Sequence, residues 1–186
     1  MTDIGPKEAV AALNDIEQIV ARVRQSRIYD LASQIMIVSG VLVLAGNVAN
    51  FLMPRQSGYI WITVNVLSVA SFAALSTMGG KQVGIRPFDF RILAAFLLFY
   101  AFGIFCSGIL GHFEPREMGA FWPIYFMLFY CMAGLWFGRA FIAIGLAIIV
   151  LTLTGYFFVE GFAFLLWMAA VNGGGLILSG LWMRRI

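Results

Sequence analysis

Six uncharged stretches, each long enough to cross a membrane as a helix, dominate the sequence. They cover residues 31–53, 59–78, 92–110, 120–137, 140–159 and 162–183, and none contains Asp, Glu, Lys, Arg or His. A membrane-spanning helix needs about 20 apolar residues. The chain is 62% hydrophobic and 11% charged, which leaves too few charges to coat a soluble domain. The sequence therefore predicts an all-α, polytopic membrane protein, with a bundle of six transmembrane helices in residues 30–186.

The basic residues are divided unequally between the two sets of connections. If the N-terminus lies inside, ten of the twelve Lys and Arg residues lie on the inner side, and only Arg55 and Arg116 lie outside. Cytoplasmic loops of membrane proteins carry this excess of positive charge. We therefore expect a multi-pass protein of the cell (plasma or inner) membrane with both termini in the cytoplasm. The first apolar run starts only at Leu31, so we expect no cleaved signal peptide.

Residues 1–29 form the only sizeable segment outside the six stretches. Apolar residues recur there every three or four positions, at Val10, Leu13, Ile16, Val20 and Val23. This spacing predicts an amphipathic helix over residues 8–28. One interpretation is a helix that lies on the lipid bilayer, with its arginines near the headgroups. The other is a docking helix for a membrane or cytoplasmic protein partner, or for a second copy in a homo-oligomer. No nucleic-acid-binding motif occurs, so nucleic acid is not an expected partner.

The groups that usually carry chemistry inside a membrane are missing from the six stretches. Ionisable residues at that depth mark proton relays and ion pathways, and these stretches have none. No Walker A or dinucleotide motif occurs, and one histidine cannot ligate a haem from both sides. The connection with His112, Glu114 and Glu117 offers three metal-binding side chains, but their spacing matches no strong motif. We therefore expect no enzymatic activity, no cofactor and no metal site.

Small and polar residues within the stretches indicate where helices approach closely. Asn47 and Asn65 lie at equal depths in the first two stretches, so we expect their side chains to face each other. Gly134 and Gly138 predict a close helix contact at the end of the fourth stretch. The connections at residues 138–139 and 160–161 are very short, which predicts that the last three helices form an antiparallel meander.

Four polar side chains fall near the middle of the membrane when residues are counted from the outer ends of the stretches: Ser68, Tyr100, Tyr130 and Asn172. Because transporters can build a substrate site from a broken helix at this depth, these four are candidate ligand-binding residues.

A glycine triplet, Gly173, Gly174 and Gly175, directly follows Asn172. It fits either a helix break beside a ligand site or a seam of close helix packing. Three successive glycines lie on three sides of a helix, so we expect neighbours from more than one direction. We also expect Gly174→Leu to disrupt folding far more than Leu178→Ala.

The function that fits these observations best is an accessory, regulatory or scaffolding subunit of a membrane assembly. Such a protein acts without catalysis, through helix–helix contacts and the N-terminal helix. The alternative is a small transporter or channel for a neutral or amphipathic solute with a midplane site, and a lipid-modifying enzyme is a third hypothesis. A water-filled cavity reaching Tyr100, Tyr130 and Asn172 would favour transport, whereas a solid core would favour interaction.

Overall fold

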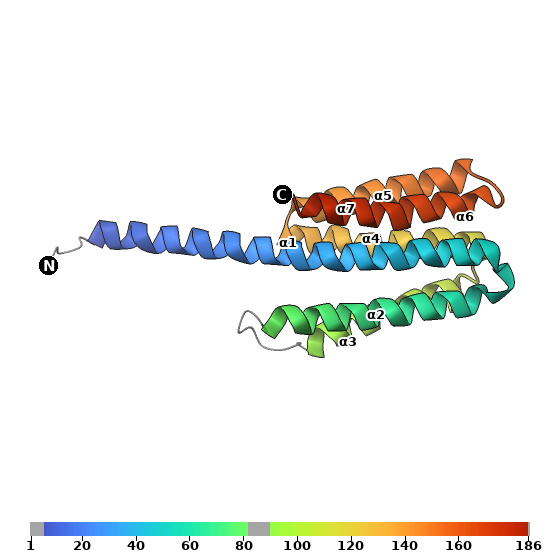
Figure 1. The fold of residues 1–186 in the computed structure, drawn as a ribbon, viewed down its shortest axis with the longest axis horizontal. Helices are drawn as coiled ribbons and strands as arrows, with labels where there is room; N and C mark the ends of the chain where they lie inside the picture. The colour runs from blue at the N-terminus through green and yellow to red at the C-terminus, as the bar shows by residue number, and fades with distance from the viewer. Residues whose placement is uncertain (1–5, 82–89, 186) are drawn as a thin grey trace.

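The structure of the protein is a computed structural model that describes residues 6–81 and 90–185 (Figure 1). Every regular element in these residues is helical, and they contain no strand. The elements are α1 (Pro6–Leu52), η1 (Pro54–Gln56), α2 (Ser57–Lys81), α3 (Phe90–Ile104), η2 (Phe105–Leu110), α4 (Pro115–Phe137), α5 (Arg139–Phe158), α6 (Ala163–Met168), η3 (Ala169–Gly174) and α7 (Gly175–Met183). The prediction of an all-α fold is confirmed.

Several of these helices are long and apolar enough to cross a membrane. Within the described residues they are Ala12–Leu52, Pro54–Leu75, Pro115–Phe137, Arg139–Phe158 and Ala163–Met183. A shorter apolar helix covers Ala94–Leu110. A helix satisfies all its backbone hydrogen bonds internally, which is what a chain of this composition needs in lipid.

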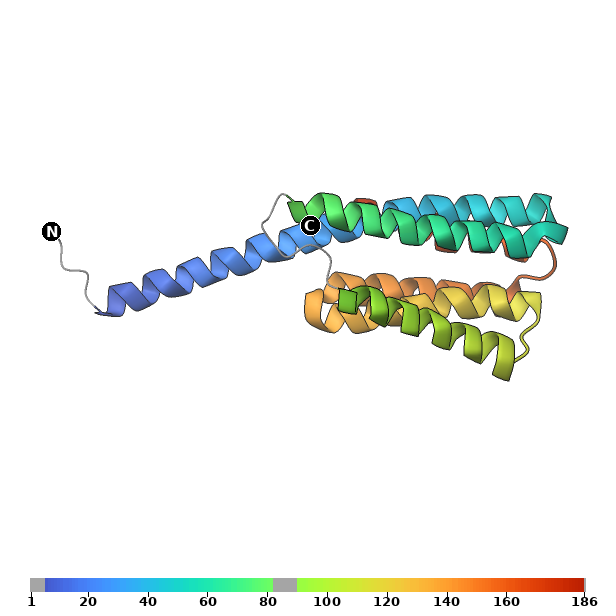
Figure 2. The ribbon, with the colours of Figure 1, turned by 90° about the horizontal axis from the view of Figure 1, so that it is seen from below.

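Helix α1 is continuous over 47 residues. It joins the expected N-terminal helix and the first uncharged stretch, which the sequence predicts as separate elements with a boundary at residue 29. The sequence between Ser26 and Ser33 contains neither glycine nor proline, so nothing there stops or kinks a helix. Figure 1 shows α1 running past one end of the bundle as a long extension. We call residues 6–27 the arm and this end of the bundle the arm end. Helix α1 begins, and helix α7 ends, towards the arm end (Figures 1 and 2).

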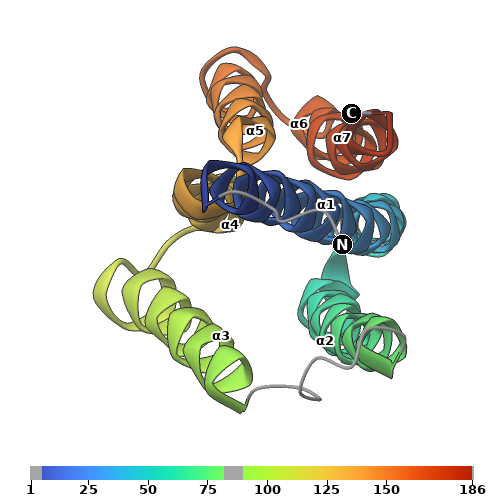
Figure 3. The same ribbon diagram turned by 90° about the vertical axis from the view of Figure 1, so that its left-hand side faces the viewer.

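Helix α1 also lies at the centre of the bundle, with α2 on one side and α6, η3 and α7 on the other (Figure 3). Helix α4 packs along α5. The main core draws on α1, α4, α5, η3 and α7, through Met36, Met127, Phe141, Ile144, Ile148, Val171, Leu176 and Met183. The last span, from α6 to α7, contacts α5 as the short connection predicts, but it packs mainly on α1, which the meander did not include.

The closest approach in the bundle joins α1 to η3 and α7, because small residues leave room for the facing backbone. A Cβ atom at Gly40 would lie 2.8 Å from the Gly173 carbonyl oxygen, and one at Gly180 would lie 2.8 Å from the Ser33 carbonyl oxygen. From Gly40 to Ser33 the chain runs seven residues back along α1, and from Gly173 to Gly180 it runs seven residues forward into α7. This is the spacing of antiparallel helices that pack closely along a seam of small residues.

Helices α3 and α4 are joined by aromatic side chains. The Phe99 and Tyr125 rings stack with centroids 4.0 Å apart, and the Tyr125 hydroxyl donates to the Phe99 carbonyl oxygen at 2.8 Å. Gly103 admits the Trp122 and Tyr125 rings, whose atoms lie 2.9 Å from the position of a Cβ. Because bulky rings separate the two backbones, α3 lies towards the edge of the bundle (Figure 3).

Candidate functional site

Asn172 is the most deeply buried of the four candidate ligand-binding residues, with 4% of its surface exposed. Its Oδ1 atom accepts a hydrogen bond of 3.2 Å from the Thr152 hydroxyl of α5. Its Nδ2 atom donates to the Met168 sulfur at 3.5 Å, one turn earlier. Both ends of the amide therefore have partners inside the packed core.

The other three candidates lie apart from Asn172. The Tyr130 ring contacts the Phe141 ring on α5, with centroids 6.2 Å apart. Thr152, the partner of Asn172, is eleven residues further along α5, or about 16 Å at 1.5 Å per residue. Tyr100 packs on Trp122 of α4 with ring centroids 5.2 Å apart, and Ser68 is half-buried on α2. The structure thus joins Asn172 to Thr152, which the sequence analysis did not select, and not to Tyr130.

The glycine triplet remains helical rather than broken: Gly173 and Gly174 end the widened, π-helical turn η3, and Gly175 begins α7. A Cβ atom at Gly173 would lie 2.5 Å from the Leu44 Cβ of α1, and one at Gly175 would lie 3.5 Å from Ile148 of α5. Neighbours do approach from two directions. A Cβ at Gly174 would meet nothing within 4 Å. The expectation that Gly174→Leu disrupts folding therefore has no steric basis in the structure, because this glycine faces neither neighbouring helix.

The two asparagines of α1 and α2 satisfy their amide nitrogens within their own helices. Asn47 donates to the Val43 carbonyl at 2.9 Å, and Asn65 donates to the Trp61 carbonyl at 2.7 Å. No hydrogen bond joins these two described side chains. The helices meet instead where Gly46 faces Val64, whose methyl carbon would lie 2.8 Å from a Cβ.

The two glycines near the end of α4 have different roles. A Cβ at Gly134 would lie 2.8 Å from the backbone nitrogen of Ile142, so this glycine lets α4 and α5 pack closely. Gly138 has a φ of 135°, a conformation that side chains disfavour, and forms the turn between the helices. It also contacts the Tyr29 hydroxyl, so α1 touches the α4–α5 turn at the arm end.

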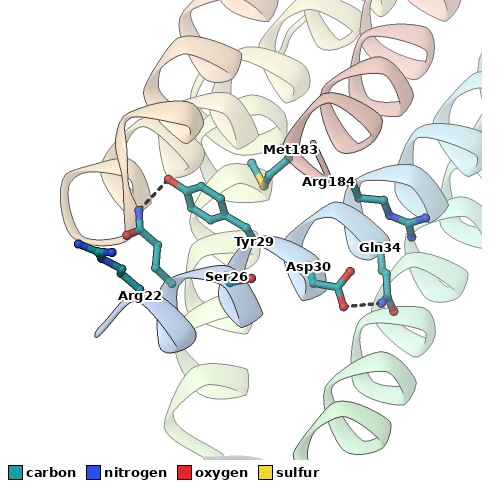
Figure 4. Close-up of a pocket in the computed structure, with 8 residues that line it drawn as sticks. Arg22, Ser26, Tyr29, Asp30, Gln34, Met183 and Arg184 are labelled. Atoms are coloured by element: carbon teal, nitrogen blue, oxygen red, sulfur yellow. Dashed lines mark hydrogen bonds between the residues drawn. The ribbon is translucent and has the colours of Figure 1, made fainter. Parts of the chain in front are cut away.

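A pocket of about 740 Å³ lies where the arm leaves the bundle (Figure 4). We call it the arm-base pocket. Its lining comes from α1 and from the end of α7: Arg22, Gln25, Ser26, Tyr29, Asp30, Gln34, Met183 and Arg184. A neighbouring concavity of about 570 Å³ shares Gln25 and Tyr29 and extends to Arg139 and Trp182.

Four polar side chains organise one side of the arm-base pocket. The Arg184 Nε donates to the Ser33 hydroxyl oxygen at 2.9 Å, and that hydroxyl donates to the Gly180 carbonyl oxygen at 2.7 Å. One turn from Ser33, the Asp30 carboxylate accepts a hydrogen bond of 3.2 Å from Gln34 Nε2. This pocket was not expected from the sequence. The one sequence feature that points to it is that Asp30 and Arg184 directly flank two uncharged stretches.

The acidic residues at the end of the bundle opposite the arm end, which we call the far end, cap the start of α4. The Glu117 carboxylate accepts a hydrogen bond of 2.9 Å from the Glu114 backbone N–H, which satisfies a donor that the first helical turn leaves unpaired. Across the residues described, no three His, Cys, Asp or Glu side chains gather closely enough to hold a metal ion.

No protein-family model, curated protein or solved structure matches this chain.

Proposed function

We propose that the protein is a non-enzymatic, six-span membrane protein that acts as an accessory, regulatory or scaffolding subunit through its helix faces and its arm. The observation that carries this proposal is the continuity of α1. A helix that is fixed in the bundle at one end and projects from it at the other presents its outer face in a defined direction. Rigid presentation reduces the ordering cost of binding a partner.

The arm presents apolar side chains that nothing in the bundle covers. Leu13, Ile16, Val20 and Val23 are between 51% and 60% exposed. Their spacing of three and four residues places them along one face of the helix. A helix with an uncovered apolar stripe buries it in a partner's groove or against another helix. This favours docking over a helix that only lies on the bilayer, because α1 does not bend at Ser26–Ser33.

The packing around Asn172 supports an interaction role more than transport of a solute. Its amide is hydrogen-bonded on both sides, and the buried Thr152 closes the space next to it. The described concavities lie instead at the arm base. A transporter with a site at Asn172 would need to open this packing.

Substituting the apolar stripe tests the docking role. Ile16→Glu with Val20→Glu is expected to lower the amount of a stoichiometric partner that co-purifies in mild detergent by about tenfold or more, since each buried anchor side chain contributes about 1 kcal/mol or more. Asn14→Glu with Gln18→Glu adds the same charge to other exposed positions of the arm and is expected to have no effect. The docking role is wrong if the two double variants retain equal amounts of partner, or if no stoichiometric partner is found.

The proposed topology has both termini in the cytoplasm, with α3 and η2 as the third of six spans. The test labels single cysteines with a membrane-impermeant thiol reagent in a background without Cys106 and Cys131. Lys81→Cys is expected to react only after the membrane is permeabilised. Glu114→Cys is expected to react in intact cells. Labelling of position 81 in intact cells would overturn this topology, whose basis is the excess of inner Lys and Arg residues.

A further inference from the structure

Two opposite charges lie at the same level of the bundle, at the boundary of its apolar part. Asp30 is the last charged residue before the uncharged stretch 31–53, and Arg184 is the first after the stretch 162–183. The hydrogen bond between Ser33 and Arg184 brings these two boundaries together. In a membrane this is the level at which apolar chains give way to lipid headgroups.

Arg184 is held in a fixed orientation with its outer donors free. Its Nε is occupied by the Ser33 hydroxyl, and Ser33 is itself fully buried and bound to the Gly180 carbonyl oxygen. Among the described residues, the terminal nitrogens of the guanidinium have no hydrogen-bond partner. Two such nitrogens in one plane match the oxygens of a phosphate group.

Asp30 supplies the complementary charge on the same pocket. Its carboxylate accepts one hydrogen bond from Gln34 and has no ion-pair partner within 4.0 Å among the described residues. Figure 4 shows Asp30 and Gln34 together on α1, with Arg184 near Gln34. The pocket volume of about 740 Å³ lies within the range of small-molecule sites.

We propose that the arm-base pocket binds the headgroup of a phospholipid that carries a primary ammonium, with the phosphodiester on Arg184 and the ammonium on Asp30. The Gln34 amide oxygen is a second acceptor for the ammonium, because only the amide nitrogen is engaged. Asp30 disfavours headgroups with net negative charge, since it repels a second anion. The inference rests on the proposed membrane placement and not on docking by the arm.

Lipid retention by the full chain tests this site. The protein is purified in mild detergent with equal amounts of phosphatidylethanolamine and phosphatidylglycerol of the same acyl chains, and the bound lipids are counted by native mass spectrometry. The wild-type protein is expected to retain phosphatidylethanolamine in about two- to fivefold excess, the ratio that an exposed ion pair of up to about 1 kcal/mol sustains. Arg184→Gln is expected to lower retention of both lipids, and Asp30→Asn to remove the preference.

Matched controls replace the same residue types away from the pocket. Asp15→Asn on the arm and Arg55→Gln at the far end are expected to behave as wild type. Equal retention of the two lipids by the wild-type protein, or a preference that survives Asp30→Asn, overturns the proposal. Because Asp30 is exposed, its conservative variant tests the site even if Arg184→Gln reduces folding.

A soluble headgroup distinguishes a lipid from a free phosphodiester. Glycerophosphoethanolamine at millimolar concentration is expected to leave the melting temperature of delipidated protein unchanged, whereas phosphatidylethanolamine raises it. If the soluble compound raises the melting temperature as much as the lipid does, the lipid assignment is wrong. These readouts do not depend on a protein partner, so they remain decisive if the docking role of the arm fails.

Discussion

Gly173→Leu is expected to prevent recovery of folded protein, because α1 leaves no room for a side chain at this position. A Cβ atom there would lie 2.5 Å from Leu44 Cβ and 2.8 Å from the Leu44 backbone nitrogen. Carbon atoms in contact are normally about 3.5–4.0 Å apart. Overpacking costs about 1–3 kcal/mol even where side chains can move aside. Here the obstacle includes backbone, so α1 and η3 would have to separate.

The neighbouring glycine provides the matched control. Gly174→Leu introduces the same side chain one position later, where a Cβ meets nothing within 4 Å. The yield of monodisperse protein on size-exclusion chromatography and its melting temperature are expected to stay near wild type for Gly174→Leu and to collapse for Gly173→Leu. Equal behaviour of the two variants would show that the seam between α1 and η3 does not form as described.

The glycine triplet illustrates what the sequence predicts and what it does not. Its composition indicates close packing, and the structure places two of the three glycines against neighbouring helices. Which glycine faces which helix depends on how far the helix has rotated about its axis at that residue. The π-helical geometry of η3 changes that rotation, and nothing in the residue types announces it. The sequence therefore indicates the segment but not which of its glycines faces a neighbouring helix, and Gly174, the position chosen for the test substitution, is the open one.

Counting depth from uncharged stretches misplaced Tyr130 for a related reason. The count began at residue 120, the first position after the charged connection, whereas α4 begins at Pro115. Charged residues do not mark the end of this helix, because Arg116 and Glu117 form its first turn. Tyr130 is therefore fifteen residues into the helix and lies beside Phe141, close to the arm end.

The arm-base pocket depends on contacts between residues that are distant in the sequence. Ser33 and Arg184 are separated by 151 positions, and only the antiparallel packing of α1 on α7 brings them together. A single sequence shows that each residue flanks an apolar stretch, but it does not show which helices are neighbours. The helices themselves were predictable because apolar length and missing charge are local properties of the chain.

Arg116→Met is expected to lower stability by about 2–4 kcal/mol. Two hydrogen bonds to a charged donor contribute about 1.5–3 kcal/mol each, and the partial exposure of Arg116 lowers their sum. The Arg116 Nη2 donates to the carbonyl oxygens of Tyr156 and Val159, both at 2.6 Å. These carbonyls belong to the end of α5, where the helix itself offers no donor. The positive charge also complements the helix dipole, and the guanidinium lies over the Phe164 ring, 4.8 Å from its centroid.

The melting temperature of Arg116→Met, compared with that of Arg55→Met, measures this contribution. Arg55 is the other basic residue of the far end and is exposed, so its replacement removes the same charge without breaking a described hydrogen bond. Arg116→Lys is expected to restore only part of the stability, because an ammonium lacks the planar donors that reach two carbonyls and stack on a ring. If the two methionine variants melt at the same temperature, Arg116 does not fasten α4 to the end of α5. The positive charge at the far end would then be a surface feature, and the connection from α5 to α6 would be held by its backbone and apolar contacts alone.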